Sequence, residues 1–130
     1  MRLPLLSLFS LLLFSCSSYP EGPIVSPFPA TDRIVNTWTW SYALEDGVNE
    51  TGPRADSLLI LGSDQTAQIC DKAGNCRNGT WNFVQRKTKL QFIFDRQAIA
   101  YDILMLKQSE LWLSYEADSQ SVLWELVPVE

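Results

Sequence analysis

Few side chains in the 130-residue sequence are of the kinds that carry out chemistry. The sequence has no histidine, which removes the commonest general base and the commonest metal ligand. Apart from Cys16, which belongs to the N-terminal signal, the sequence has two cysteines, too few for a four-ligand zinc site. It contains no glycine-rich phosphate loop and no Gly-x-Ser-x-Gly turn. Asp102 interrupts an apolar run and is the one candidate for carboxylate catalysis. An acid in such a position is more often exposed to solvent or hydrogen-bonded than catalytic. We expect no enzymatic activity, no metal and no cofactor.

The two cysteines in the middle of the chain have the spacing of a bridged hairpin. Cys70 and Cys76 flank a turn sequence that ends in Gly74 and Asn75, two residues that tolerate the positive φ of a tight turn. Facing positions on antiparallel strands lie about 4.5 to 5.5 Å apart at Cα, within reach of a disulfide. The sequence therefore predicts a Cys70–Cys76 disulfide in a compartment outside the cytoplasm. The alternative is a pair of free thiols buried in the sheet.

The N-terminal residues have the pattern of an export signal. Met1 and Arg2 precede an apolar run, Leu3 to Ser15, which falls short of the about 20 residues that a membrane-spanning helix needs. The run ends in Leu13-Phe14-Ser15-Cys16, which resembles the bacterial lipobox. The resemblance implies a lipoprotein with a signal peptide at 1–15 and with fatty acids such as palmitate on Cys16. The alternative is an ordinary secretory signal that ends near a cysteine.

The residues after Cys16 suggest where the protein is anchored. Ser17 stands where an inner-membrane retention signal would have Asp, so the resemblance implies a cell-envelope protein anchored in the outer membrane. Both the periplasmic face and the outer surface of that membrane are compatible with the sequence. We expect residues 16–33 to be a proline-rich tether, because its prolines prevent helix and discourage sheet. At a polyproline extension of about 3.1 Å per residue, the roughly 15 residues from Ser17 to Thr31 would hold a domain at 34–130 up to about 45 Å from the lipid.

From Ile34 onward, apolar and polar residues alternate with a period of two, which is typical of strands. The clearest strand is Thr37 to Leu44, in which Trp38, Trp40, Tyr42 and Leu44 are expected to share one face. Further strands are expected at residues 57–61, 65–70, 76–84, 89–94, 99–106, 110–115 and 122–127. Eight short strands joined by tight turns favour an all-β, antiparallel up-and-down barrel, because closure removes exposed edges. A two-sheet sandwich is the alternative.

Four short motifs between Asn36 and Val127 resemble the short lipocalin-like domain of bacterial outer-membrane lipoproteins. They are Thr37-Trp38-Thr39-Trp40, Gly79-Thr80-Trp81, Tyr101-Asp102-Ile103 with Leu106, and Glu110-Leu111-Trp112-Leu113. The sequence departs from lipocalins proper in having Asn36-Thr37-Trp38 in place of their Gly-x-Trp. The resemblance implies an eight-stranded barrel that binds a small apolar or amphipathic molecule.

Two functions are compatible with such a barrel. We favour a structural or protein-interaction barrel that is filled by its own side chains and offers loops and exposed aromatics such as Trp112 or Trp124 to a protein partner. The alternative is binding or carriage of a small hydrophobic ligand in the interior. The interior would then be lined by Trp38, Trp40, Tyr42, Trp81, Phe83, Phe92, Phe94, Tyr101 and Tyr115. A formal net charge of -5 offers no basic face, so nucleic acid is not expected as a partner.

Overall fold

The strands predicted from alternation form one antiparallel sheet. The computed structural model describes residues 19–23, 26 and 28–129, so the predicted signal peptide and Cys16 lie outside the described residues. The elements of the described part of the chain are α1 (Ala30–Ile34), β1 (Asn36–Glu45), β2 (Val48–Asn49), α2 (Thr51–Arg54), β3 (Leu58–Leu61), β4 (Thr66–Cys70), β5 (Cys76–Val84), β6 (Lys89–Phe94), β7 (Gln97–Leu106), β8 (Leu111–Ala117) and β9 (Gln120–Pro128). None of the helices in this part of the chain is long and apolar enough to cross a membrane.

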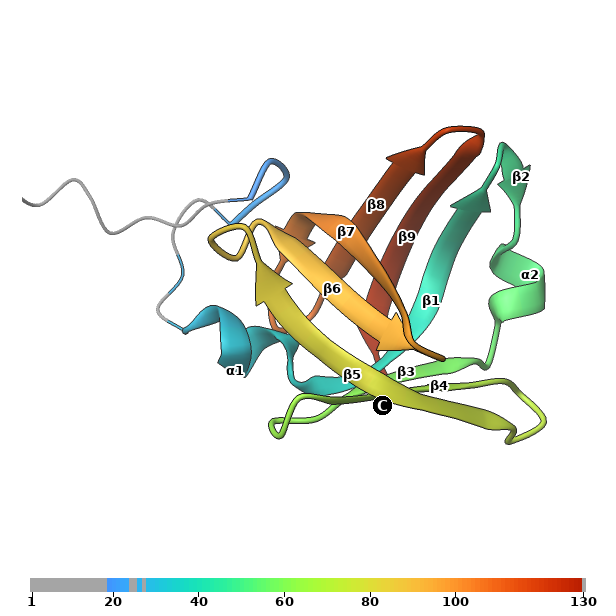
Figure 1. The fold of residues 1–130 in the computed structure, drawn as a ribbon, viewed down its shortest axis with the longest axis horizontal. Coiled ribbons are helices and arrows are strands. Elements are labelled where there is room, and N and C mark those ends of the chain that lie inside the picture. Colours follow the sequence, from blue (N-terminus) through green and yellow to red (C-terminus); the bar gives the residue numbers. More distant parts are fainter. Residues whose placement is uncertain (1–18, 24–25, 27, 130) are drawn as a thin grey trace, which may run out of the picture.

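The sheet closes on itself to form a barrel. Each strand from β3 to β8 pairs with the next, β3 also pairs with β1, and β9 pairs back with β1. The closing register runs from Trp38 opposite Pro128 to Glu45 opposite Val122. Eight strands therefore form a closed antiparallel barrel, and β2 is a short extra strand on the edge of β1 (Figure 1). The predicted barrel is confirmed, and the sandwich alternative is wrong.

The barrel interior is filled by alternate residues of the strands. The inward leucines of four strands are at most 1% exposed, namely Leu59, Leu61, Leu90, Leu111, Leu113 and Leu126. Trp38 is also fully buried, and its indole N–H donates a hydrogen bond of 2.9 Å to the carbonyl of Ile34. Burial of each such side chain contributes about 1.5 to 3 kcal/mol to folding, which makes this core the main source of stability.

The first strand departs from the predicted alternation. Its register against β9 shifts between Trp40 and Tyr42, which marks a β-bulge with one extra residue. After the bulge the inward position is Ala43, which is 0% exposed, and Glu45 shares its face. The expectation that Tyr42 and Leu44 continue the inward face is therefore wrong, because one inserted residue reverses the side-chain alternation.

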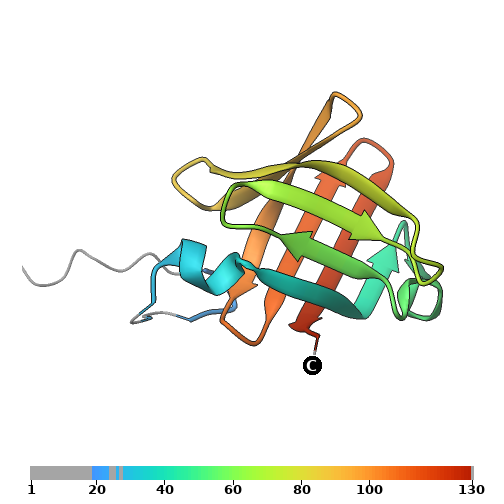
Figure 2. The ribbon, with the colours of Figure 1, turned by 90° about the horizontal axis from the view of Figure 1, so that it is seen from below.

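The two ends of the barrel differ, as Figures 1 and 2 show. At the end where β1 begins, α1 covers the barrel with Ala30 and Ile34, which are 5% and 0% exposed. We call this the closed end. The other end carries α2, the β1–β2 turn and the β4–β5 hairpin, and we call it the open end.

Residues 19–23, which we call the strap, lie against the closed end. The N–H of Glu21 donates to the carbonyl of Leu104 at 2.6 Å, and the N–H of Leu106 donates to the carbonyl of Gly22 at 3.1 Å. These two backbone hydrogen bonds extend the pairing of β7 beyond the barrel strands. Part of the segment expected to be a free tether is therefore attached to the folded domain.

Side chains reinforce this attachment. Tyr19 is 5% exposed, and burial raises the pKa of its phenol. The guanidinium of Arg33, at the end of α1, lies 5.8 Å from the centre of the Tyr19 ring and donates through Nη1 to the carbonyl of Leu106 at 2.7 Å. The strap, α1 and β7 are thus held together, and the packed unit begins before the predicted boundary at Ile34.

Candidate functional site

The side chains leave a cleft at the open end of the barrel. Its volume is about 270 Å³, and it lies between β1 and α2 on one side and β4 to β7 and β9 on the other. Its walls are mostly apolar and aromatic, with a small number of charged groups among them. The lining residues are Glu45, Arg54, Ile69, Arg77, Phe92, Phe94, Gln97, Ile99, Tyr101, Val122 and Trp124.

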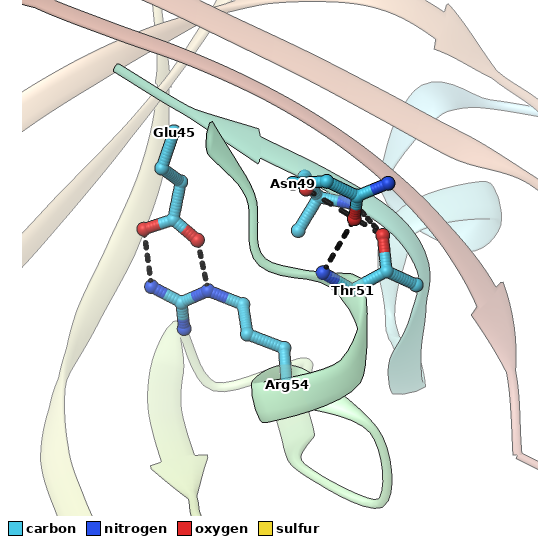
Figure 3. A network of polar contacts seen from close by, with 5 residues as sticks. Glu45, Asn49, Thr51 and Arg54 are labelled. Atoms are coloured by element: carbon cyan, nitrogen blue, oxygen red, sulfur yellow. Dashed lines mark hydrogen bonds and ion pairs between the residues drawn. The ribbon is translucent and has the colours of Figure 1, made fainter. Parts of the chain in front are cut away.

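An ion pair lies in the wall of the cleft. Arg54 donates through Nη2 to Oε1 of Glu45 at 2.8 Å and through Nε to Oε2, so the pair is bidentate (Figure 3). The hydrogen bond from Arg54 lowers the pKa of the Glu45 carboxyl, and the same bond raises the pKa of the Arg54 guanidinium. Both groups therefore stay charged at neutral pH, with the carboxylate already occupied by a partner.

The loop that contains α2 brings Arg54 to this position. Thr51 anchors the start of α2, because its hydroxyl accepts a hydrogen bond from the N–H of Ala43 at 3.0 Å. Asn49 accepts from the N–H of Thr51 at 3.0 Å (Figure 3), and the N–H of Arg54 donates to the carbonyl of Glu50 at 3.1 Å. The loop is thus pinned to the edge of β1 while the guanidinium reaches over the cleft.

Two tryptophans support the guanidinium. The Cζ atom of Arg54 lies 5.2 Å from the ring centre of Trp40 and 5.0 Å from that of Trp124, within the range of cation–π interaction. The two indole rings meet edge to face at 5.4 Å. Arg54 is therefore fixed by one carboxylate and two aromatic rings.

Both of these tryptophans have an unused hydrogen-bond donor. Trp40 and Trp124 are 4% and 5% exposed, and neither indole N–H has an acceptor among the described residues. The Trp124 N–H is near enough to Glu45 to contribute slightly to the lowering of its pKa, but lies outside hydrogen-bond geometry. A buried donor without an acceptor costs about 1 to 3 kcal/mol. Trp124 lines the cleft but its Nε1 atom is itself covered, so an acceptor on a bound molecule would remove that cost only with a shift of the indole ring.

Tyr101 forms the centre of the aromatic wall. Its ring stacks on Trp124 at 5.0 Å and meets Phe92 at 5.6 Å. Burial raises the pKa of the Tyr101 phenol to about 12, so the hydroxyl stays protonated at neutral pH. Tyr115 packs on the same ring at 5.6 Å from behind. The wall offers flat apolar faces together with a neutral hydroxyl.

The structure brings together only some of the residues that the sequence suggested for an interior site. Phe92, Phe94 and Tyr101 line the cleft, and Trp40 and Tyr115 pack behind its wall. The remaining four are Trp38, Trp81 and Phe83, which belong to the packing of the closed half, and Tyr42, which the bulge turns outward.

One tryptophan that we expected on the outer surface lies inside. Trp124 pairs across the sheet with Ala43 and Leu113, which are both fully buried inward residues, so it shares their face. Its expected role as an exposed contact for a protein partner is therefore wrong. Trp112, on the opposite face of β8, is half-buried.

The predicted disulfide is present and borders the cleft. Cys70 and Cys76 are joined across a directly facing pair of β4 and β5, with their Cα atoms 4.0 Å apart. The next pair in register, Ile69 opposite Arg77, lines the cleft. The bridge therefore fixes the hairpin that forms one side of the candidate site.

The carboxylate singled out by the sequence is not part of the cleft. The side chain of Asp102 is 54% exposed on the outer face of β7 and lies 3.5 Å from Nζ of Lys89. Within residues 19–23, 26 and 28–129, no three His, Cys, Asp or Glu side chains are grouped as metal ligands. The apolar and aromatic lining of the cleft is the kind of surface that binds a molecule with an apolar body.

A closed eight-stranded antiparallel barrel with one added strand is a lipocalin-like fold, and comparison with solved structures agrees. A lipocalin-like protein from Bacteroides uniformis is similar to 75% of this chain and 99% of its own, with 13% sequence identity and a TM-score of 0.56. At that identity the likeness shows the fold. No protein-family model matches the sequence, and no curated protein matches it.

Proposed function

We propose that this protein is a lipid-anchored, lipocalin-like lipoprotein of the outer membrane that binds a small amphipathic molecule in the open-end cleft. The observation that carries the proposal is the aromatic cleft of about 270 Å³, whose wall contains Trp124 with a buried indole N–H that has no acceptor among the described residues. The volume is slightly below the about 300 to 1,000 Å³ of typical ligand pockets, which favours a small or partly enclosed ligand. A purely structural barrel would not need such a cleft.

The lining indicates the kind of molecule that would fit. Phe92, Phe94 and Ile99 offer apolar surface for a hydrocarbon or ring body. The hydrogen-bonding capacity that remains is mostly donor capacity, from the Trp124 indole and from Nη1 of Arg54, which is not used toward Glu45. The best complement is an apolar body that ends in a carboxylate, carbonyl or other acceptor.

The protonation states in the cleft support binding rather than catalysis. General acid–base groups work best with a pKa near the working pH. The pKa of Glu45 is lowered by its hydrogen bond from Arg54, and the pKa of Tyr101 is raised to about 12 by burial, so both are displaced away from neutrality. Neither group is suited to exchange a proton with a substrate at neutral pH.

The test compares two tryptophan variants by calorimetric titration with decanoate and with its methyl ester. Trp124→Phe removes the cleft indole N–H but keeps an aromatic ring, while Trp112→Phe is a matched control on the outer face of β8. Because a hydrogen bond contributes about 0.5 to 1.5 kcal/mol, Trp124→Phe should weaken binding by about twofold to tenfold. Trp112→Phe should bind as the wild-type protein does. Absence of binding to the wild-type protein, or equal losses in both variants, would contradict the proposal.

A further inference from the structure

We propose that the closed end of the barrel faces the lipid bilayer and that the cleft opens away from it. The inference rests on the lipid anchor of the proposed function, and it does not depend on whether the cleft binds a ligand. It follows from where the chain is attached to the barrel on its way from the anchor.

The length of chain between the anchor and the barrel is short. Cys16 precedes Tyr19 by three residues, and an extended chain spans at most about 3.6 Å per residue, or about 11 Å in all. A tether that stayed free as far as Ala30 would have fourteen residues and a reach of about 50 Å. Attachment of the strap therefore decides whether the barrel lies near the membrane or far from it.

The strap is attached at one end only. Its hydrogen bonds to Leu104 and Leu106 are at the end of β7, and Tyr19 is buried beside Arg33 of α1. All of these contacts belong to the closed end, on the same side of the barrel as α1 in Figures 1 and 2. Phe28, which directly precedes α1 and its N-cap Pro29, is 45% exposed and adds apolar surface next to this end. The surface that a lipid on Cys16 would bring to the bilayer is thus the closed end.

The cleft lies at the opposite end of the strands. The strand β9 has nine residues, and at about 3.3 Å per residue with a tilt of about 40° it spans about 20 to 25 Å along the barrel axis. The cleft would therefore open about that much further from the bilayer than the closed end does. A ligand would enter from the aqueous phase or from a carrier there, rather than directly from the lipid beneath the barrel.

Two turns at opposite ends of β8 allow a matched measurement. Ser109 is exposed in the turn at the closed end, and Ser119 is exposed in the turn at the open end. Ser109→Cys and Ser119→Cys in the full chain are each labelled with a fluorophore without reduction of the disulfide. The lipidated proteins are then reconstituted into vesicles of neutral phospholipid that contain a headgroup-labelled quencher lipid. We expect several-fold stronger quenching at position 109 than at position 119.

Two further variants separate the possible failures. The Cys16→Ala variant should neither stay with the vesicles nor incorporate labelled palmitate. If it behaves as the wild-type chain does, both the proposed lipid anchor and this inference are contradicted. Retention of the wild-type chain with equal quenching at both positions would overturn the orientation alone. Tyr19→Ala combined with Glu21→Pro removes the buried ring and the Glu21 donor, and should reduce the difference between the two labels. An unchanged difference in that folded variant would show that the strap does not set the orientation.

Discussion

At the scale of single residues, Arg54 organises the candidate site. Its guanidinium is held by Glu45 and by the rings of Trp40 and Trp124, so one side chain joins the α2 loop to the inner wall of the barrel. The pair is largely shielded, with side-chain exposures of 30% and 23%. Removal of either partner would leave the other charge unpaired in a shielded site. The unpaired charge destabilises the fold by more than the intact pair stabilises it.

The Glu45 carboxylate should make stability depend on acidic pH. Its pKa is lowered in the folded state by the hydrogen bond from Arg54, relative to an ordinary value of 4.5. The stabilisation is therefore complete above pH 4.5 and is lost as the pH falls through the lowered folded-state value. Denaturant unfolding at a series of pH values should show a steeper loss below pH 4.5 for the wild-type protein than for Glu45→Gln.

Asp102→Asn is the matched control for this prediction. It removes a carboxylate from an exposed ion pair, and such pairs contribute about 0 to 1 kcal/mol. Its unfolding curves should follow those of the wild-type protein across the same pH range. If Glu45→Gln and the wild-type protein lose stability in parallel, the Arg54 contact does not stabilise the fold as described.

The residues of the cleft were predictable only where they follow a regular pattern. Phe92 and Phe94 come from strict alternation along β6, which fixes the inward face. Glu45 could not be assigned, because the bulge after Trp40 reverses the alternation and has no sequence signature here. Arg54 lies in a loop, and no periodicity connects a loop residue to a wall that is adjacent only in space.

At the scale of elements, the β4–β5 hairpin combines a covalent bond with a side of the cleft. Cys70 and Cys76 lock the facing pair, and Asp71 accepts hydrogen bonds from the N–H groups of Ala73 at 3.0 Å and Asn75 at 2.9 Å within the turn. The disulfide was predictable, because both cysteines and the turn between them are local in sequence. The short elements α1, α2 and β2 were not predicted, because each has five residues or fewer and no repeating pattern.

Loss of the bridge should weaken the domain without unfolding it. For a closed loop of about seven residues the chain-entropy model gives about 2 kcal/mol. The double variant Cys70→Ser, Cys76→Ser should therefore unfold at lower denaturant concentration, with the change in free energy of unfolding near that value. The wild-type protein in reducing agent should show the same loss. A double variant as stable as the oxidised wild-type protein would contradict this account, and one that does not fold would mean that the bridge matters more than its loop length implies.

At the scale of the whole molecule, the barrel has a packed closed half and a cleft at the open end. Ile34 of α1 is fully buried at the closed end, and Trp38 and Leu111 are fully buried in the core. The barrel could be predicted from its many short strands and tight turns, which leave few other ways to pair every edge. The uneven filling depends on side-chain contacts between distant strands, which one sequence does not disclose.

The two halves should respond separately to substitution. Ile34→Ala removes fully buried atoms from the closed end and should lower the free energy of unfolding by about 2 to 5 kcal/mol. Thr31→Ala, on the exposed side of the same helix, should change it by at most about 0.5 kcal/mol. Both variants should keep the wild-type affinity for any ligand of the cleft. A change of that affinity in Ile34→Ala, measured by calorimetric titration, would show that the ends are coupled.

The pairing of β1 with β9 also sets the order in which the protein can fold. Trp38 faces Pro128, so the seam joins two segments that lie far apart in the sequence. Until residues 120–128 have left the ribosome, β1 lacks its longest pairing partner and the barrel has an open edge. Contacts this distant in sequence slow folding, because the loop between them must be closed first. The barrel therefore stays incompletely folded until residues 120–128 take their place in it, and the edge of β1 that they cover stays unpaired until then.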